Sequence, residues 1–187
     1  MRYYFLRDLA WKFLIKHQVS AMPLNLDQIA KEEGWVLCSY EKFAKVADIN
    51  QNDLILWKGD GFTINFEGKI LICFNQNKPE ERVRFTIAHE FGHILLHSKI
   101  KPEDLEKEAD MFAARILAPL CLIKALNVAD PRKLSKIFKI SQNAAAKRLR
   151  RCVELESRGK FFTNKYEIKF FKQMKGWLKS NDWSNLY

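Results

Sequence analysis

The sequence predicts an α+β fold in which helices dominate, with a small, mostly antiparallel sheet, a long helix that carries the candidate site, and a helical region after it. Three observations support this prediction. Apolar residues recur at helical spacing near the N-terminus and through most of the chain after residue 79. Short apolar runs separated by glycine-containing turns occupy residues 35–74. No run approaches the ~20 apolar residues that a membrane-spanning helix needs.

The first half of the chain is expected to supply two helices and then the strands. Residues 3–18 and 24–33 have helical spacing, and Gly34 marks the end of the second helix. Strands are expected at residues 35–38, 53–57, 62–66 and 70–74, with turns at 59–61 and 67–69.

Prolines mark helix boundaries in the second half. Pro79 can open a helix that continues through residue 97, and Pro102 opens another that runs to about residue 118. Pro119 ends that pattern, and Pro131 begins a basic helical region. We therefore expect a main domain at residues 1–128, a helical basic region at 129–157 and a basic amphipathic helix and tail at 158–187.

Composition and charge limit the class of protein. The 187 residues are 48% hydrophobic and 29% charged, which excludes a disordered chain and allows one principal domain. The four cysteines form neither C-x-x-C pairs nor a dense pattern, so a reducing cytoplasm is expected. Residues 1–130 carry 17 Lys and Arg against 18 Asp and Glu, whereas residues 131–187 carry 15 against 4. This excess indicates an acidic partner such as nucleic acid, or else a solvated basic face.

His89-Glu90-Phe91-Gly92-His93 forms an H-E-x-x-H segment. On a helix this spacing sets the two imidazoles on one face, about 6 Å apart along the axis, which suits a single zinc ion. Glu90 projects roughly 100° further round the helix, where its carboxylate can reach a metal-bound water. We therefore expect His89 and His93 to bind one Zn²⁺ per chain and Glu90 to act as the general base. The alternative is a core helix whose histidines form only hydrogen bonds.

A tetrahedral zinc held by two histidines and water needs a third protein ligand. On the next expected helix, Glu106 lies inside the apolar arc and Asp110 borders it, whereas Glu108 points toward the solvated side. A carboxylate on a core-facing arc needs a partner, so we expect Glu106 to be the third ligand. Asp110 is expected to orient a histidine through its free N–H. The alternative is an acidic cluster that only caps the helix or lies on its exposed face.

His97 is the nearest further histidine in the sequence. It lies about 12 Å along the helix axis from His89, too far for one ion to join both side chains. We expect it outside the coordination sphere, with an auxiliary role such as oxyanion stabilisation open to it or to a tyrosine.

Two blocks make the chain recognisable. RFTIAHEFGHILLH at residues 84–97, followed by E-x-x-A-D-x-F-A-A-x-I-L-A-P at 106–119, resembles the ImmA/IrrE family of metallopeptidases. The second block is also similar to the gluzincin pattern, a glutamate ligand followed four residues later by a supporting acid. The resemblance covers roughly residues 20–155.

The resemblance implies a zincin-like minimal metallopeptidase domain whose active-site helix is followed by a helix-turn-helix-like part. Position by position, it implies His89, His93 and Glu106 as zinc ligands, Glu90 as base and Asp110 as support. Family members are cytoplasmic, often belong to phage or mobile elements, and cleave helix-turn-helix repressors, which switches on the silenced genes. A repressor substrate, and derepression of phage, mobile-element or stress genes, are implied by the resemblance alone.

The basic third carries two further patterns. Residues 131–152 resemble a helix-turn-helix with its turn at 139–141, and the family uses such a part partly as a scaffold. Its candidate nucleic-acid contacts are Lys147, Arg148, Arg150 and Arg151. Residues 165–179 interleave lysines with apolar residues, which predicts an amphipathic helix that docks on the chain's own core or recruits a partner, nucleic acid or anionic membrane.

These patterns together predict a zinc endopeptidase. The competing class is a DNA-binding transcriptional regulator in which the metal site is structural or vestigial. A third class is a module that binds a partner through its terminal helix.

Overall fold

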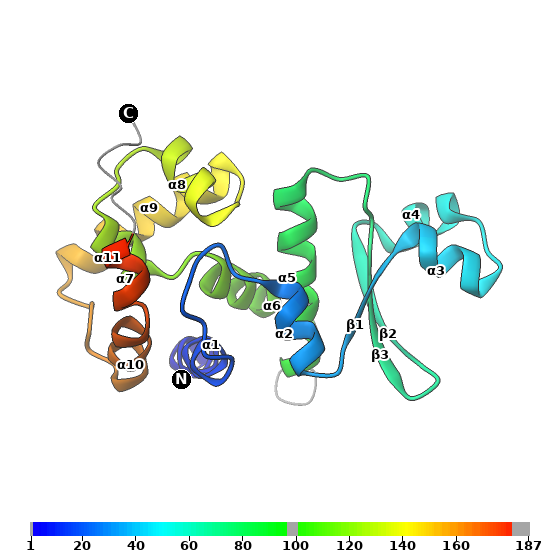
Figure 1. Cartoon of the computed structure of the whole chain (residues 1–187), viewed down its shortest axis with the longest axis horizontal. Coiled ribbons are helices and arrows are strands. Elements are labelled where there is room, and N and C mark those ends of the chain that lie inside the picture. The colour runs from blue at the N-terminus through cyan, green and yellow to red at the C-terminus, as the bar shows by residue number, and fades with distance from the viewer. Residues whose placement is uncertain (1, 97–100, 181–187) are drawn as a thin grey trace. The chain divides into compact units, whose positions relative to one another are not determined.

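The computed structural model describes residues 2–96 and 101–180, without the side chains of residues 2, 3, 102 and 103. It is of the α+β class that the sequence predicts, with one small sheet among helices (Figure 1). Two compact units form it: a central unit, Asn25–Ala113, and a terminal unit that combines Met1–Leu24 with Ala114–Tyr187. Among the described residues, no helix is long and apolar enough to cross a membrane.

The sheet of the central unit has three strands in the order β1-β3-β2. They are β1 (Val36–Ser39), β2 (Gly61–Phe66) and β3 (Lys69–Phe74). A tight turn with positive φ at Glu67 and Gly68 joins β2 to β3, which are antiparallel. The β1 strand pairs parallel to β3, so the sheet is mixed, and its longer pairing, between β2 and β3, is antiparallel as expected. The reason for the parallel pair is a helical connection after β1, which carries the chain across so that β3 lies between β1 and β2.

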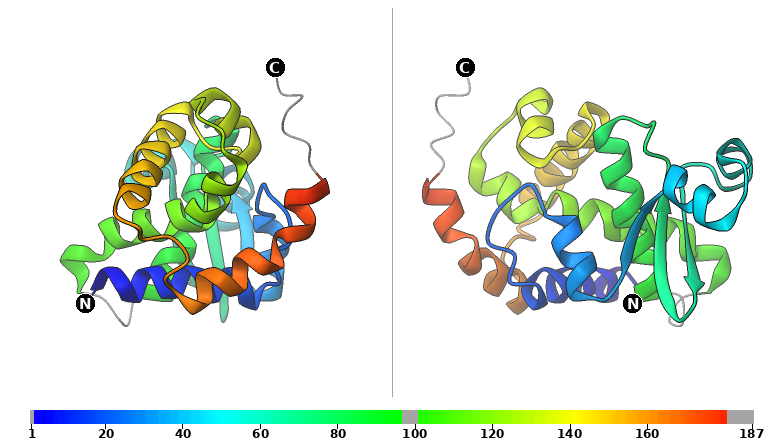
Figure 2. Two further views of the ribbon diagram at one scale, coloured as in Figure 1. Left: turned by 90° about the vertical axis from the view of Figure 1, so that its left-hand side faces the viewer. Right: turned by 45° about the vertical axis from the view of Figure 1, so that its right-hand side comes forward.

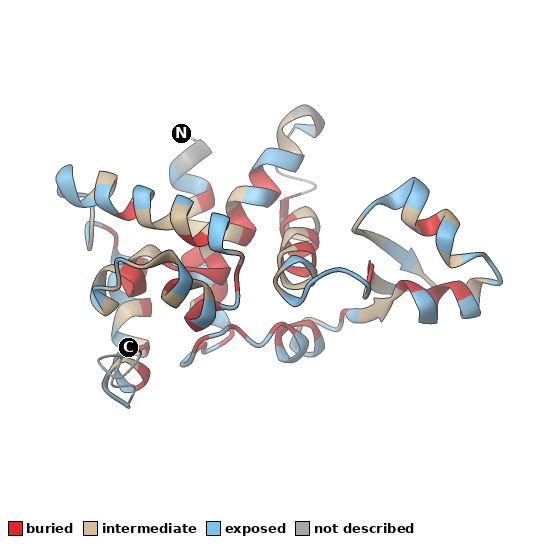
Figure 3. Ribbon diagram, turned by 90° about the horizontal axis from the view of Figure 1, so that it is seen from above, coloured by how far each residue is buried: buried red, intermediate tan, exposed pale blue. Residues whose placement is uncertain are grey.

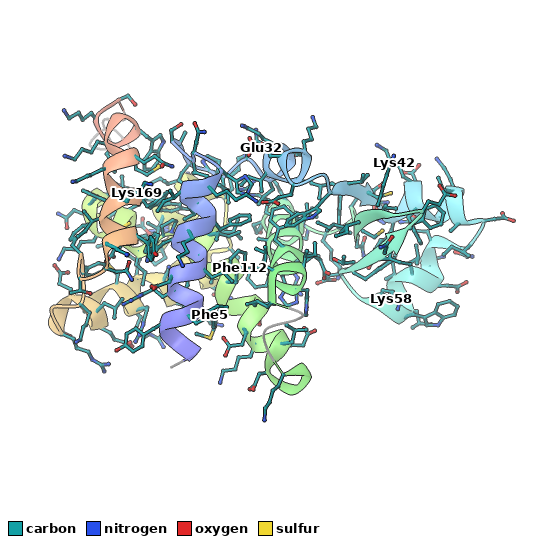
Figure 4. The ribbon with its side chains drawn as sticks, turned by 90° about the horizontal axis from the view of Figure 1, so that it is seen from below. Phe5, Glu32, Lys42, Lys58, Phe112 and Lys169 are labelled. Atoms are coloured by element: carbon teal, nitrogen blue, oxygen red, sulfur yellow. The ribbon has the colours of Figure 1, made fainter. Side chains whose placement is uncertain are left out.

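That connection consists of α3 (Tyr40–Ala47) and α4 (Gln51–Lys58). The strand expected at residues 53–57 is therefore wrong, because these residues form the second of the two helices. The Asn50 side chain caps it by accepting the Asn52 N–H at 2.8 Å. Only Leu54 of α4 is buried, while Trp57 is 69% exposed. The apolar run at residues 53–57 therefore belongs to a surface helix and not to a buried strand. Both helices are mostly exposed or half-buried, with only short buried stretches (Figure 3), and Figure 4 labels Lys42 of α3 and Lys58 of α4.

Three helices complete the central unit: α2 (Leu26–Glu32), α5 (Glu80–Leu96) and the first part of α6 (Pro102–Leu117). The predicted helix starts at Pro79 and Pro102 agree with these bounds to within one residue. Helix α5 packs against α2, β2 and β3, and its Phe91 ring lies 4.9 Å from that of Trp35. Ile87, Ala88 and Phe91 are buried, so α5 is anchored along one side while the histidines occupy another.

The terminal unit consists of helices. Its N-terminal part contributes α1 (Arg2–Lys16). Its C-terminal part contributes the last residues of α6, then α7 (Leu120–Leu126), α8 (Pro131–Phe138), α9 (Gln142–Ser157), α10 (Lys165–Gln173) and α11 (Lys175–Ser180). Helix α10 lies alongside α1 (Figure 2). The Asn164 amide donates to Asp8 Oδ1 at 2.6 Å, and the Gln173 amide donates to the Val19 carbonyl at 2.7 Å. These bonds fix both ends of α10 to the N-terminal segment.

The amphipathic helix expected at residues 165–179 is divided between α10 and α11, with Met174 at the break. Its apolar side chains Phe170, Met174 and Trp177 are buried within the terminal unit. The Phe170 ring lies 5.4 Å from that of Trp11 in α1. This burial agrees with docking on the chain's own core, and the lysines of α10 face outward.

We predict that Phe170→Ala lowers the free energy of unfolding by about 3–5 kcal/mol, because it removes a fully buried ring from the α1–α10 contact. Ile168→Ala, at an exposed position of the same helix, should cost less than about 1 kcal/mol. Urea unfolding followed by tryptophan fluorescence measures both. Equal costs for the two variants would contradict the docking of α10 on α1.

Candidate metal centre

His89 and His93 lie one turn apart on α5 and point to the same place. Their Nε2 atoms are 2.7 Å apart, and their rings meet edge to face with centroids 4.5 Å apart. The ligand atoms of His89, Glu90 and His93 all lie within 4.8 Å of one another. The helix thus brings together the H-E-x-x-H side chains as the sequence spacing predicts.

Two acids of α6 face this pair. Glu106 places one carboxylate oxygen 3.3 Å from His89 Nε2 and the other 3.2 Å from His93 Nε2. Asp110, one turn further along α6, places Oδ1 2.8 Å from His89 Nδ1. The structure therefore brings both predicted acids to the histidines, and each acid approaches the nitrogen that its expected role requires.

The burial of the α6 acids differs from the expectation. The Glu106 side chain is 79% exposed although its helical position falls inside the apolar arc. It lies on the first turns of α6, whereas the buried residues of that arc, Phe112, Ala113 and Ile116, come later. Glu108, expected in solvent, is only 7% exposed because it lies at the other edge of the buried arc, next to Phe112. Periodicity predicted correctly which side of α6 is apolar, but it did not predict which turns of that side are buried by the rest of the protein.

The charges of this cluster indicate a cation. A carboxylate only accepts hydrogen bonds, so the contact with Asp110 requires His89 to carry a proton on Nδ1. In the neutral imidazole the other nitrogen, Nε2, then has a free lone pair. That lone pair then faces His93 Nε2 and one oxygen of Glu106, while the other Glu106 oxygen faces His93 Nε2. So many acceptors at close range repel one another unless a proton or a metal ion lies between them. Two ligands about 2.0–2.1 Å from a tetrahedral zinc are roughly 3.3 Å apart, which is the separation that Glu106 keeps from each histidine, whereas the two Nε2 atoms, 2.7 Å apart, would have to separate to bind the ion.

Glu90 points to a different partner from the histidines. Its side chain is buried, and its Oε2 accepts a 2.8 Å hydrogen bond from the Thr63 hydroxyl of β2. This bond fixes the carboxylate beside the histidines and leaves Oε1 free of that contact. Thr63 is a neighbour of the candidate site that the sequence patterns missed, since only the packing of β2 against α5 brings it to Glu90.

Gly92 is a second residue whose role the sequence did not indicate. A Cβ at this position would lie 2.9 Å from the Ala109 Cα and 3.2 Å from the Ala109 carbonyl. Helices α5 and α6 therefore approach as closely as their backbones permit, between the histidines and the two acids. Only glycine at residue 92 allows this approach.

The remaining predicted residues lie elsewhere. His97 falls outside the described residues. Lys147, Arg148, Arg150 and Arg151 belong to α9 in the terminal unit. Arg148 is not available as a nucleic-acid contact, because its Nε and Nη2 donate to the Ala118 carbonyl at 2.9 and 2.6 Å. Arg151 pairs with Glu154 at 2.8 Å.

We predict that Gly92→Ala weakens zinc binding at least tenfold and destabilises the fold by about 1–3 kcal/mol, because the added methyl pushes α6 away from α5. Gly176→Ala is the matched control. Its Cβ meets nothing within 4 Å, and alanine favours the helix by up to about 1 kcal/mol. Zinc competition against a chromophoric chelator and urea unfolding measure the two effects. A Gly92→Ala protein with wild-type zinc affinity would contradict this account of α6.

One comparison with known proteins identifies the family. The model of the IrrE N-terminal-like domain matches residues 45–150, more than half of the chain. No curated protein matches the chain with significant similarity. The matched range contains β2, β3 and the whole cluster of His89, Glu90, His93, Glu106 and Asp110. The chain therefore belongs to the ImmA/IrrE family of metallopeptidases.

Proposed function

We propose that this protein is a zinc endopeptidase in which His89, His93 and Glu106 hold one Zn²⁺. The observation that carries the proposal is the convergence of both imidazole Nε2 atoms on the Glu106 carboxylate, at 3.2 and 3.3 Å, beside the buried Glu90. Nitrogen and carboxylate donors are the ligands that zinc takes in catalytic sites, where three protein ligands leave a position for water. Membership of a metallopeptidase family supports the same assignment.

Zinc, when bound, lowers the pKa of its water and polarises the peptide carbonyl. Glu90 would accept the proton of that water and pass it to the leaving amine, a role supported by the position of its carboxylate within 4.8 Å of the histidine ligand atoms. The Thr63 hydroxyl holds Oε2 of Glu90, so that Oε1 can receive the proton. Asp110 keeps the proton of His89 on Nδ1 and so keeps Nε2 available as a ligand.

The edge of the sheet offers a place for the substrate. Strand β2 lies at one end of the order β1-β3-β2 and pairs only with β3 among the described residues. An extended peptide that added to this edge would run beside Thr63 and Glu90. Hydrogen bonds between the backbones of the peptide and of β2 would then position the scissile bond, whatever side chains the peptide carries.

For the substrate we propose a helix-turn-helix repressor, whose cleavage would release phage, mobile-element or stress genes. The family resemblance of residues 84–119 supports this class. The alternative is a DNA-binding regulator with a structural or vestigial metal site, and in such a protein Glu90 would have no catalytic role. A purely structural zinc needs His89, His93 and Glu106 but is indifferent to a base beside them.

We predict that Glu90→Gln abolishes cleavage, by at least about 10²-fold, while zinc content is unchanged, because the amide cannot accept the proton. The assay incubates the purified protein with the repressor encoded nearest to its gene and follows the fragments by mass spectrometry. Glu81→Gln, the same change on α5 outside the motif, serves as control and should cleave as the wild type does. A Glu90→Gln protein that cleaves at the wild-type rate would exclude this mechanism.

A further inference from the structure

Helices α8 and α9 form a compact helix-turn-helix. Helix α8 has eight residues, and a turn of three residues leads to the 16-residue α9. The turn begins with Lys139 in the left-handed region, at a φ of 49°, and ends with Ser141, whose hydroxyl accepts the Ala144 N–H. Ser135 Oγ donates to the Ile140 carbonyl at 2.6 Å and fastens the turn to α8. A turn of this length is the one found in DNA-binding helix-turn-helix motifs.

Packing fixes which side of α9 faces outward. Leu134, Ile137 and Phe138 of α8 are buried, as is Ile140 in the turn. From α9, Ala145 and Cys152 are buried on the same side, and Arg148 donates inward to the Ala118 carbonyl. Because this inner side is occupied, α9 cannot turn about its axis without losing these contacts.

The outward side carries the residue types that read DNA. Gln142, Asn143, Lys147 and Arg150 are all exposed. Taking Gln142 as 0°, Arg150, Asn143 and Lys147 follow at about 80°, 100° and 140°, so they share one arc of the helix. Ala146, within that arc at about 40°, is small enough to let a flat surface approach. Gln142 and Asn143 lie on the first turn of α9, which is the part of a recognition helix that contacts bases.

Charge favours an anionic partner for this face. Residues 131–157 contain eight Lys and Arg and only two acids. Both acids are already paired, Glu154 with Arg151 and Glu156 with Lys124. In the part of the chain that the structure describes, Lys147 and Arg150 have no acidic partner, so their charges remain available.

We propose that α9 enters the major groove of duplex DNA, with Gln142 and Asn143 facing base edges and Lys147 and Arg150 contacting phosphate or guanine. An α-helix fits this groove, and recognition helices contact bases through their N-terminal residues. Glutamine and asparagine pair with adenine, and arginine with guanine. Duplex RNA is disfavoured because its major groove is too narrow for side chains to read. The contact set differs from the one expected from sequence, since Arg148 and Arg151 serve the fold and Gln142 and Asn143 replace them.

The first experiment measures the charge contribution. Fluorescence anisotropy follows the full chain binding a labelled 26-bp duplex of random sequence, at salt concentrations from 50 to 200 mM. Lys147→Ala/Arg150→Ala should weaken binding at least tenfold and reduce the slope of log affinity against log salt by about two. Lys169→Ala/Lys172→Ala removes the same charge from exposed positions of α10 and should change affinity less than twofold. Equal losses in both double variants, or no binding by the wild type at 50 mM salt, would overturn the proposal.

The second experiment tests base reading. Selection from a randomised duplex library should enrich a motif that the wild type prefers at least 100-fold over the starting pool. Gln142→Ala/Asn143→Ala should lose most of this preference while retaining affinity for random duplex. Failure to enrich any motif, or equal binding to an RNA duplex of the same sequence, would overturn the proposed groove contact. Glu90→Gln should bind the selected DNA as the wild type does, which separates this inference from the proposed peptidase activity.

Discussion

The close approach of α5 and α6 at Gly92 is the constraint on which the candidate metal centre depends. The two histidines belong to one helix and the two facing acids to the other, so the separation of the helices sets every distance between them. A backbone contact with Ala109 fixes that separation. Since a side chain at residue 92 would force the helices apart, the glycine is as necessary to the ligand geometry as the ligands themselves.

His89 and Glu90 are each also fixed by a contact outside the ligand cluster. Asp110 selects the tautomer of His89, and Thr63 holds the Glu90 carboxylate on the side of β2. Groups that must take part in proton transfer work best when their orientation is set before substrate arrives. The sheet, α5 and α6 each contribute to this orientation, so the central unit contains all the residues assigned here to zinc binding and proton transfer.

Local patterns in the sequence predicted the helices around Pro79 and Pro102, the α+β class and the residues that gather at the centre. The patterns failed where tertiary packing decides. The run at residues 53–57 has strand composition but lies on a surface helix, and Glu106 and Glu108 exchange their expected burial because coverage varies along α6. Thr63 could not be found because its role depends on a contact with a residue 27 positions away. The grouping of α1 with α10 depends on bonds across more than 150 residues.

The central claim is that two helices share one metal ion, and metal stoichiometry tests it most directly. Elemental analysis of the purified wild-type protein should give about one zinc per chain, and Glu81→Ala should match it. Glu106→Ala should lose the zinc or bind it far more weakly, because only two protein ligands remain. A wild-type protein that holds no zinc even after zinc is added back, or a Glu106→Ala protein that retains it fully, would contradict the account.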